Sequence, residues 1–456
     1  MNYLTNDTIV ALATPAGSGA IGVIRLSGPD ALIITQKVFK GKDLFVQASH
    51  TVHFGHIADG DIILDEVLVS LFIAPRSYTR ENVVEISCHG SAYIIESVIK
   101  LLIRQGARAA QPGEFTLRAF LNGQLDLSQA EAVADLIASN SKASQHAAMN
   151  QLRGGFSNQL SALRQQLVNF ASLIELELDF AEEDVEFANR GQLKQAVVDT
   201  LNILTRLIKS FELGNAIKQG ISTVIAGRPN AGKSTLLNAL LNEERAIVSD
   251  IAGTTRDTIE EVLNINGVNF RLVDTAGLRE ATDTIEAIGV EKAYEKIRQS
   301  AMLIYVFDVT ATTKEQLAAD LANLQRGDLP TLIVANKTDL LQADVSDDIP
   351  KISNMLYVSA KEKQHIDELK QRIYHTAISD GIDENETLIT NVRHLEALQK
   401  TEASLIKVLE GIDNPITSDF LAMDIKQALH YLGEITGTVT TDDLLENIFS
   451  KFCIGK

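Results

Sequence analysis

The residues best suited to chemistry lie in one short run, residues 227–234, with the sequence GRPNAGKS. Its two glycines allow backbone N–H groups to turn inward around phosphate oxygens. Lys233 can then reach the β- and γ-phosphates of a nucleotide, and the hydroxyl of Ser234 can bind Mg²⁺. The run therefore predicts a phosphate-binding loop, and the alternative is a chance match in a glycine-containing turn.

The elements on either side of this loop decide between the two interpretations. Residues 223–226 are apolar and mostly β-branched or small, and an apolar-periodic segment begins at Thr235. This order predicts a strand, a glycine loop and a helix, which is the context that phosphate binding requires. The residues expected to contact the nucleotide here are Asn230, Ala231, Gly232, Lys233, Ser234 and Thr235.

Two later loops predict that the nucleotide carries guanine. The Asp339 carboxylate can accept from N1–H and from the exocyclic amine of guanine, and the Asn336 amide can contact the same edge. Adenine lacks both of those donors, so the pair favours GTP over ATP. The residues expected around the base are Asn336, Lys337, Asp339, Ser359, Ala360 and Lys361.

Two further loops are expected near the metal ion and the γ-phosphate. Asp274 ends the apolar run 270–273, where a second carboxylate is needed on the metal side. Thr255 lies in a glycine-containing loop and offers Mg²⁺ a hydroxyl whose position depends on the γ-phosphate. The expected contacts are Ser249, Asp250, Ile251, Ala252, Gly253, Thr254, Thr255, Asp274, Thr275, Ala276 and Gly277.

The whole chain sets broad limits on these predictions. Its 456 residues predict more than one domain. A net charge of −19 argues against a broad electrostatic surface for nucleic acid, so binding RNA would need a local basic patch or a basic partner. The two cysteines are expected to be free thiols in a reducing compartment, and no apolar run is long enough to span a membrane. We therefore expect a cytoplasmic protein.

The N-terminal region, residues 1–122, predicts an α+β domain. Strands are expected at 8–13, 21–26, 67–73 and 83–87, and a helix at 92–104, after which Pro112-Gly113 interrupts the chain before 114–121. Residues 17–22, GSGAIG, match a dinucleotide-binding pattern literally. That pattern must open a helix, whereas β-formers follow here, so we predict a glycine-rich connection between strands.

Helical periodicity dominates the two stretches that flank the nucleotide-binding region. We predict an all-α domain from residues 123–216 and 381–456, packed together, with a Ras-like α/β P-loop GTPase domain at 217–380 inserted between them. The acidic run 175–186 is more simply a solvated face than a metal site.

Three motifs carry a resemblance to a known family. They are Pro112-Gly113-Glu114-Phe115 with Arg118-Ala119-Phe120-Leu121-Asn122, then Asp274-Thr275-Ala276-Gly277-Leu278-Arg279-Glu280, and the tail Phe452-Cys453-Ile454-Gly455-Lys456. Together with the inserted GTPase domain, they resemble the tRNA-modification GTPases of the MnmE (TrmE) family along essentially the whole chain.

The resemblance implies a function for the N-terminal domain. In that family this domain resembles folate-binding modules, forms the homodimer, and binds 5-formyltetrahydrofolate in place of a methylene-tetrahydrofolate donor. The implied contacts are Arg25, Glu85, Gln124 and Lys456. With the flavoprotein MnmG, in a heterotetramer, the family adds an aminomethyl or carboxymethylaminomethyl group to C5 of the wobble uridine (U34) of tRNA.

The hydrolysis reaction also needs a residue that orients water. Leu278 occupies the position where many Ras-like GTPases have glutamine, and an apolar side chain cannot polarise water. The resemblance implies Glu286 for this role; without it, an exposed helix carboxylate is the simpler interpretation. It also implies K⁺ beside the phosphates, with the ligands Asn230, Ser249, Ile251 and Thr254.

Three questions stay open from the sequence. The first is whether the chain modifies tRNA or is a purely regulatory or ribosome-assembly GTPase, which would need an attached basic RNA-binding module. The second is whether Cys453 is a small buried hydrophobe or a reactive thiol near the folate. The third is whether His89 acts as an acid or base. A lone histidine near a strand end is more often structural, and we predict a structural role.

Overall fold

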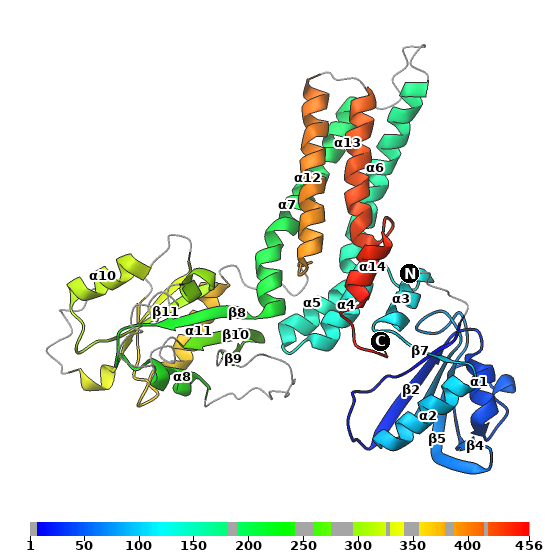
Figure 1. The fold of residues 1–456 in the computed structure, drawn as a ribbon. Helices are drawn as coiled ribbons and strands as arrows, with labels where there is room; N and C mark the ends of the chain where they lie inside the picture. Colours follow the sequence, from blue (N-terminus) through cyan, green and yellow to red (C-terminus); the bar gives the residue numbers. More distant parts are fainter. Residues whose placement is uncertain are drawn as a thin grey trace. The chain divides into compact units, whose positions relative to one another are not determined.

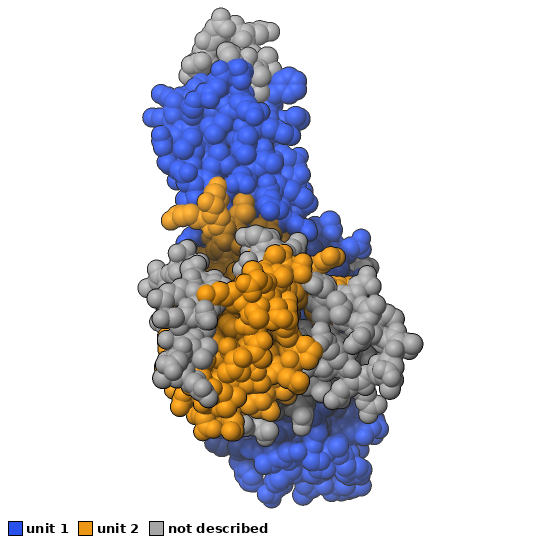
Figure 2. Space-filling model, turned by 90° about the vertical axis from the view of Figure 1, so that its left-hand side faces the viewer, with its two compact units in different colours: residues 1–137, 149–204, 396–456 blue, residues 138–148, 205–395 orange. Residues whose placement is uncertain are grey.

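The computed structural model describes residues 7–179, 189–241, 260–274, 295–324, 329–341, 355–378, 387–414 and 418–455. The chain divides into two compact units, which Figure 2 colours separately. Unit 1 combines residues 1–137, 149–204 and 396–456, and unit 2 combines residues 138–148 and 205–395. Each unit therefore takes residues from stretches that are distant in the sequence.

Unit 1 begins with a seven-stranded sheet in the order β3-β4-β5-β6-β2-β1-β7 (Figure 1). All neighbouring strands pair antiparallel except β1 and β7, which are parallel. The strands are β1 Ile9–Leu12, β2 Ile21–Ser27, β3 Phe39–Lys40, β4 Thr51–Asp59, β5 Ile62–Phe72, β6 Val83–His89 and β7 Arg108–Ala109. The glycine-rich run at 17–22 connects two antiparallel strands and opens no helix, as predicted.

Helices α1 (Ala31–Val38) and α2 (Ala92–Arg104) pack against this sheet and share its core. Successive side chains of a strand point to opposite faces. On β5, Val67, Val69 and Leu71 are accordingly buried in that core, while Leu68 is exposed. The predicted α+β class is confirmed for this region.

The rest of unit 1 is helical. Its elements are α3 Glu114–Leu121, α4 Leu127–Ala138, α6 Gly155–Asp179, α13 Ser418–Thr436 and α14 Asp442–Phe449, with most of α12 Val392–Asp413 and the first half of α7 Arg190–Gln219. Helices α6 and α13 pack against each other, and each buries one apolar stripe, as Leu163 and Leu167 do on α6 and Ile425 and Leu432 on α13. The two helical stretches thus form one core, as predicted.

Unit 2 is built on a six-stranded sheet in the order β13-β12-β11-β8-β10-β9 (Figure 1). Its strands are β8 Ile221–Ala226, β9 Glu260–Ile265, β10 Val268–Asp274, β11 Met302–Asp308, β12 Thr331–Asn336 and β13 Met355–Tyr357. Only β9 pairs antiparallel; the other pairs are parallel. The carboxyl ends of β8, β11 and β12 therefore meet at one edge, where ligands of α/β sheets bind.

Helices α8 (Lys233–Leu241), α10 (Lys314–Leu324) and α11 (Ile366–Ala377) pack against this sheet. The apolar strands, α8 and α11 form one core, and α10 packs in a second cluster with β11 and β12. Residues 138–148, which include the start of α5 (Lys142–Leu152), also belong to this unit. The N–H of Ala143 donates to Gly267 O at 3.1 Å, and Asn269 Nδ2 donates to Asn140 Oδ1 at 2.7 Å.

None of the described helices is both long enough and apolar enough to cross a membrane.

Candidate functional site

The predicted phosphate-binding loop connects β8 to α8, so it is held between a buried strand and a helix N-terminus. Both positions require glycine, because atoms of neighbouring strands lie too close to leave room for a Cβ. A Cβ on Gly227 would lie 1.9 Å from Val306 O, and one on Gly232, whose φ is +89°, would lie 2.3 Å from Asn336 Nδ2. The loop therefore fits closely against β11 and β12, and larger side chains would displace it.

Lys233 folds back over this loop. Its Nζ donates to Gly227 O and to Arg228 O, both at 3.0 Å, and the residue is only 8% exposed. An ammonium in this position can exchange two carbonyl acceptors for phosphate oxygens without a large movement. Ser234 follows it in the first turn of α8, where backbone N–H groups and the helix dipole favour an anion.

Asn336 joins the loops expected around the base. It is 2% exposed; its Nδ2 donates to Ala231 O at 2.9 Å, and its Oδ1 accepts from the N–H of Ala360 at 3.0 Å. Both polar atoms of the amide are thus engaged within the protein. Asn336 therefore fixes the phosphate loop to the 359–361 loop, next to Asp339.

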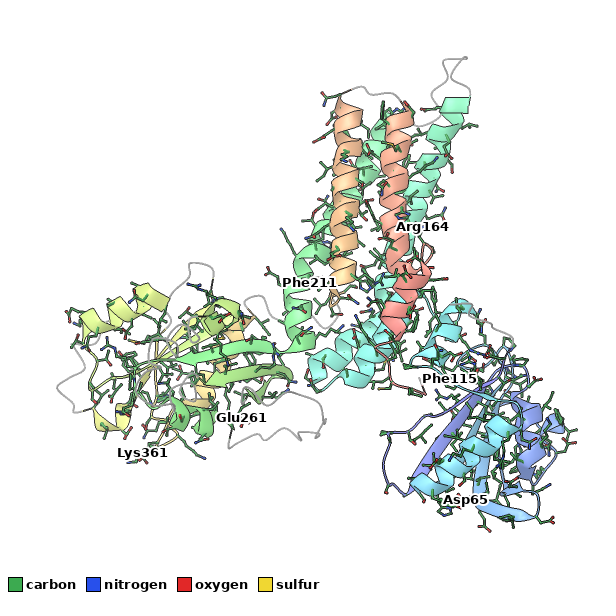
Figure 3. The ribbon with its side chains drawn as sticks, viewed as in Figure 1. Asp65, Phe115, Arg164, Phe211, Glu261 and Lys361 are labelled. Carbon is green, nitrogen blue, oxygen red and sulfur yellow. The ribbon has the colours of Figure 1, made fainter. Side chains whose placement is uncertain are left out.

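Asp339 is exposed and oriented by Ser359, whose hydroxyl donates to Asp339 Oδ1 at 2.6 Å. Lys337 lies between these loops with φ +68°, and its Nζ donates to Asp308 Oδ2 at 2.7 Å. Lys361 is exposed in the last of the predicted loops (Figure 3). The described residues thus bring a phosphate loop, an oriented carboxylate and two lysines to one sheet edge.

Several predicted residues cannot be placed. Asp274 ends β10, but its side chain is not described. The residues outside the described part of the chain are Ser249, Asp250, Ile251, Ala252, Gly253, Thr254, Thr255, Thr275, Ala276, Gly277, Leu278, Glu286 and Lys456.

A second arrangement of polar side chains lies in unit 1, on strands β2 and β6. Arg25 pairs with Glu85 across the two strands, with Nε 2.8 Å from Glu85 Oε1. The guanidinium carbon lies 5.6 Å from the ring centre of Tyr78 and 5.7 Å from that of Phe115, which is fully buried. Burial raises the pKa of the Tyr78 hydroxyl, so it stays neutral.

The C-terminal tail reaches the same place. The N–H of Gly113 donates to Cys453 O at 3.3 Å, Ile454 forms a bridge with Pro112, and Arg25 Nη1 donates to Gly455 O at 3.4 Å. Gly455 has φ +96°, and a Cβ on it would lie 2.1 Å from Leu12 O. The tail is thus held by its backbone and by a glycine that nothing larger can replace.

The structure also corrects or qualifies individual predictions. Cys453 is exposed, so its interpretation as a buried hydrophobe is wrong. Ile454 is 60% exposed, because backbone contacts rather than its side chain hold the tail. Gln124 accepts from Arg80 Nε at 2.9 Å, and among the described contacts it touches neither Arg25 nor Glu85. His89 is held by buried Asp65, with Nδ1 2.7 Å from Asp65 Oδ1.

A cavity of about 950 Å³ lies elsewhere in unit 2. Its lining includes Gly220 and Ile221 at the start of β8, and Arg206, Lys209 and Arg298 around them. The phosphate loop follows the other end of the same strand, roughly 20 Å away at about 3.3 Å per residue. None of the predicted site residues lines this cavity.

Two family models match the sequence: "GTP-binding protein TrmE N-terminus" over residues 8–124, and "MnmE helical domain" over residues 127–453. Proteins named tRNA modification GTPase MnmE are similar over nearly their full length. The one from Cytophaga hutchinsonii is 56% identical over 450 residues, 99% of this chain and 98% of that protein. The one from Flavobacterium psychrophilum is 53% identical over 459 residues, 99% of both chains.

Among solved structures, Era from Aquifex aeolicus with GDP.AlF4- is 26% identical and covers 41% of this chain and 67% of that chain, with a TM-score of 0.28. A score that low says nothing about the chain as a whole.

Proposed function

Since the chain belongs to the tRNA modification GTPase MnmE family, and is a GTP hydrolase acting in tRNA modification, we propose a specific role for each of its two sites. The sheet edge of unit 2 binds and hydrolyses GTP. The Arg25–Glu85 site binds a reduced folate, 5-formyl- or methylene-tetrahydrofolate, that supplies a carbon to C5 of the tRNA wobble uridine.

The GTP proposal is supported mainly by the link that Asn336 makes between the phosphate loop and the 359–361 loop. This link sets the distance between the two ends of the nucleotide site. Lys233 offsets charge on the β- and γ-phosphates, Asp339 accepts from guanine, and Lys361 lies beside the base. Mg²⁺, when bound, would offset further phosphate charge, and Ser234 and Thr255 are the residues that would hold it.

We propose that Glu286, which lies outside the described part of the chain, orients the attacking water. We further propose K⁺ beside the phosphates, with Asn230 as one ligand; its exposed position in the phosphate loop, at φ +62°, is compatible with that role. The other proposed ligands, Ser249, Ile251 and Thr254, are outside the described residues.

The folate proposal is supported by the chemistry of the Arg25–Glu85 pair. A pterin ring is planar and carries both N–H donors and a carbonyl acceptor. Glu85 can accept from the donors, Arg25 can donate to the carbonyl, and the nearby Tyr78 and Phe115 rings provide apolar surface. Gly455 brings the tail to Arg25, so Lys456, the next residue, is also assigned to this site.

We propose that MnmG supplies the flavin and much of the tRNA-binding surface in a heterotetramer, and that the N-terminal domain forms a homodimer. A net charge of −19 is consistent with a basic surface provided by a partner. The two free cysteines are consistent with a cytoplasmic location.

The deciding experiment is mass analysis of the wobble uridines in tRNA from cells that lack this chain. Loss of the C5 group, restored by the wild-type chain but not by a Lys233→Ala variant, is the expected result. Unchanged modification would contradict a role in tRNA modification and favour a purely regulatory GTPase.

A further inference from the structure

The second residue of the phosphate loop, Arg228, is bound to a helix that lies outside the predicted site. Its Nε donates to Asp320 Oδ2 at 2.6 Å, and its Nη2 donates to Asp320 Oδ1 at 3.0 Å. Asp320 belongs to α10 and lies 92 positions further along the chain. A bidentate arginine–carboxylate pair fixes orientation as well as distance, which a single contact cannot do.

Tyr305 completes this arrangement from β11. Its hydroxyl donates to Asp320 Oδ2 at 2.5 Å, and the residue is 1% exposed, so the phenol cannot move away. Hydrogen bonding from Arg228 lowers the pKa of Asp320 in spite of its partial burial, which keeps the carboxylate charged. We call Arg228, Asp320 and Tyr305 the loop clamp.

The loop clamp is linked directly to the phosphate-binding lysine through the backbone of Arg228. The carbonyl of Arg228 accepts from Lys233 Nζ at 3.0 Å, as does the carbonyl of Gly227. Gly227 itself lies against Val306, the residue after Tyr305. The first half of the loop is therefore fixed by β11 on one side and by the Arg228 side chain on the other.

This geometry also indicates the role of the Arg228 side chain. An arginine in a phosphate loop could contact the phosphates directly. Here the Nε and Nη2 edge of its guanidinium is bonded to Asp320, and the pair carries no net charge, so it adds little attraction for an anion.

We propose that Asp320 and Tyr305 are positioning residues for nucleotide binding, which act by holding Arg228 and, through its backbone, the acceptors that orient Lys233. This inference rests on the GTP-binding role proposed above. A loop that is already ordered loses less conformational entropy when a ligand binds, so the clamp raises affinity for any nucleotide with β-phosphate. GDP and GTP should benefit equally.

The test is the affinity of full-length protein for GDP and GTP, measured by fluorescence titration, together with steady-state hydrolysis. For Asp320→Asn we expect affinity for both nucleotides to fall on the order of tenfold, since a charge-assisted pair is lost. KM should rise by the same factor while kcat changes much less, because ground and transition states use the loop alike. Tyr305→Phe should show the same pattern with a smaller loss.

Two controls separate positioning from general destabilisation. Glu315→Gln removes an exposed carboxylate from the same helix and should leave both affinities unchanged. The double variant Arg228→Met, Asp320→Asn should bind GDP and GTP no more weakly than Asp320→Asn alone, because both substitutions break the same loop clamp. The thermal midpoint without nucleotide shows whether folding has changed.

Unchanged affinity in both Asp320→Asn and Tyr305→Phe would overturn the inference. So would an Arg228→Met variant that loses GTP affinity while Asp320→Asn does not, since Arg228 would then contact the phosphates itself. Wild-type protein that binds no guanine nucleotide would instead refute the proposed function.

Discussion

The carbonyl oxygen of Gly455 accepts a hydrogen bond from Arg25 at 3.4 Å, although 430 positions separate the two residues in the sequence. Arg25 also holds Glu85, so the tail and the proposed folate contacts form a single structure. The first prediction tests this connection.

Replacing Gly455 by alanine should weaken binding of 5-formyltetrahydrofolate at least several-fold. A Cβ would lie 2.1 Å from Leu12 O, so the tail would have to leave its place. Gly60→Ala is the matched control, since Gly60 also has positive φ but has no atom within 4 Å of the added Cβ. Isothermal titration calorimetry measures the affinity of both variants for 5-formyltetrahydrofolate.

Deleting residues 453–456 should have the same effect on folate binding, abolish tRNA modification and leave GTP affinity within a few-fold. If the truncated and full-length proteins bind folate equally, the tail is not part of the site.

Asp339→Asn should lose affinity for GTP and gain affinity for xanthosine triphosphate. The amide replaces an acceptor by a mixed donor and acceptor, and xanthine has a carbonyl where guanine has an amine. A mismatch of this kind costs about 1–3 kcal/mol, or roughly 5- to 150-fold in affinity. Asp367→Asn, at an exposed position of α11, is the control. Equal GTP binding by Asp339→Asn would show that this carboxylate does not contact the base.

Hydrolysis should be faster in K⁺ than in Na⁺ at equal ionic strength, and Glu286→Ala should bind nucleotide normally but lose turnover. Orienting the water matters in the transition state and not in binding. Asp283→Ala changes a carboxylate in the same segment and should retain activity. Normal turnover of Glu286→Ala in K⁺ would show that another residue orients the attacking water.

The stability of the N-terminal domain should fall in acid because of Glu114. Burial alone would raise the pKa of this carboxyl, but hydrogen bonds from Arg108 and from the N–H of Gln111 lower it overall. Because the pKa is lower in the folded state, ionised Glu114 stabilises the fold at pH values above its unfolded pKa of about 4.3. This stabilisation is lost as the pH falls through the folded-state pKa.

Glu114→Gln should therefore lower the free energy of unfolding by about 1–3 kcal/mol at pH 7 and flatten its decline below pH 4.5. Urea unfolding at several pH values measures both effects. Glu96→Gln, in an exposed pair with Lys100, is the control. An unchanged acid profile in Glu114→Gln would contradict this assignment.

Local patterns predicted the elements of this fold well. The helix expected at 92–104 is α2, Ala92–Arg104, and the strand expected at 83–87 lies in β6, Val83–His89. Both have strong periodicity or a continuous apolar run, which are properties of neighbouring residues. The glycine loop between β8 and α8 was predictable for the same reason.

Contacts between distant residues could not be predicted in this way. Nothing near Arg228 in the sequence points to Asp320, and nothing near Asn336 shows that Ala231 and Ala360 engage its amide. The assignment of residues 138–148 to unit 2 likewise depends on backbone and side-chain contacts with β10 and its turn. Such pairings exist only once the sheet has formed.

The division of the chain among the two units has a consequence for the order in which a ribosome-bound chain can fold. Residues 205–395, which make up nearly all of unit 2, emerge as one stretch, whereas the helical core of unit 1 needs both α6 and α13. Translation proceeds at about 5–20 residues per second, so α6 waits on the order of 10–60 s for its partner. During that time its apolar stripe is exposed, and the inserted unit can complete its fold first. We expect nascent chains halted once residue 395 has left the ribosome, but before α13 has emerged, to bind GTP and to engage chaperones through residues 155–179.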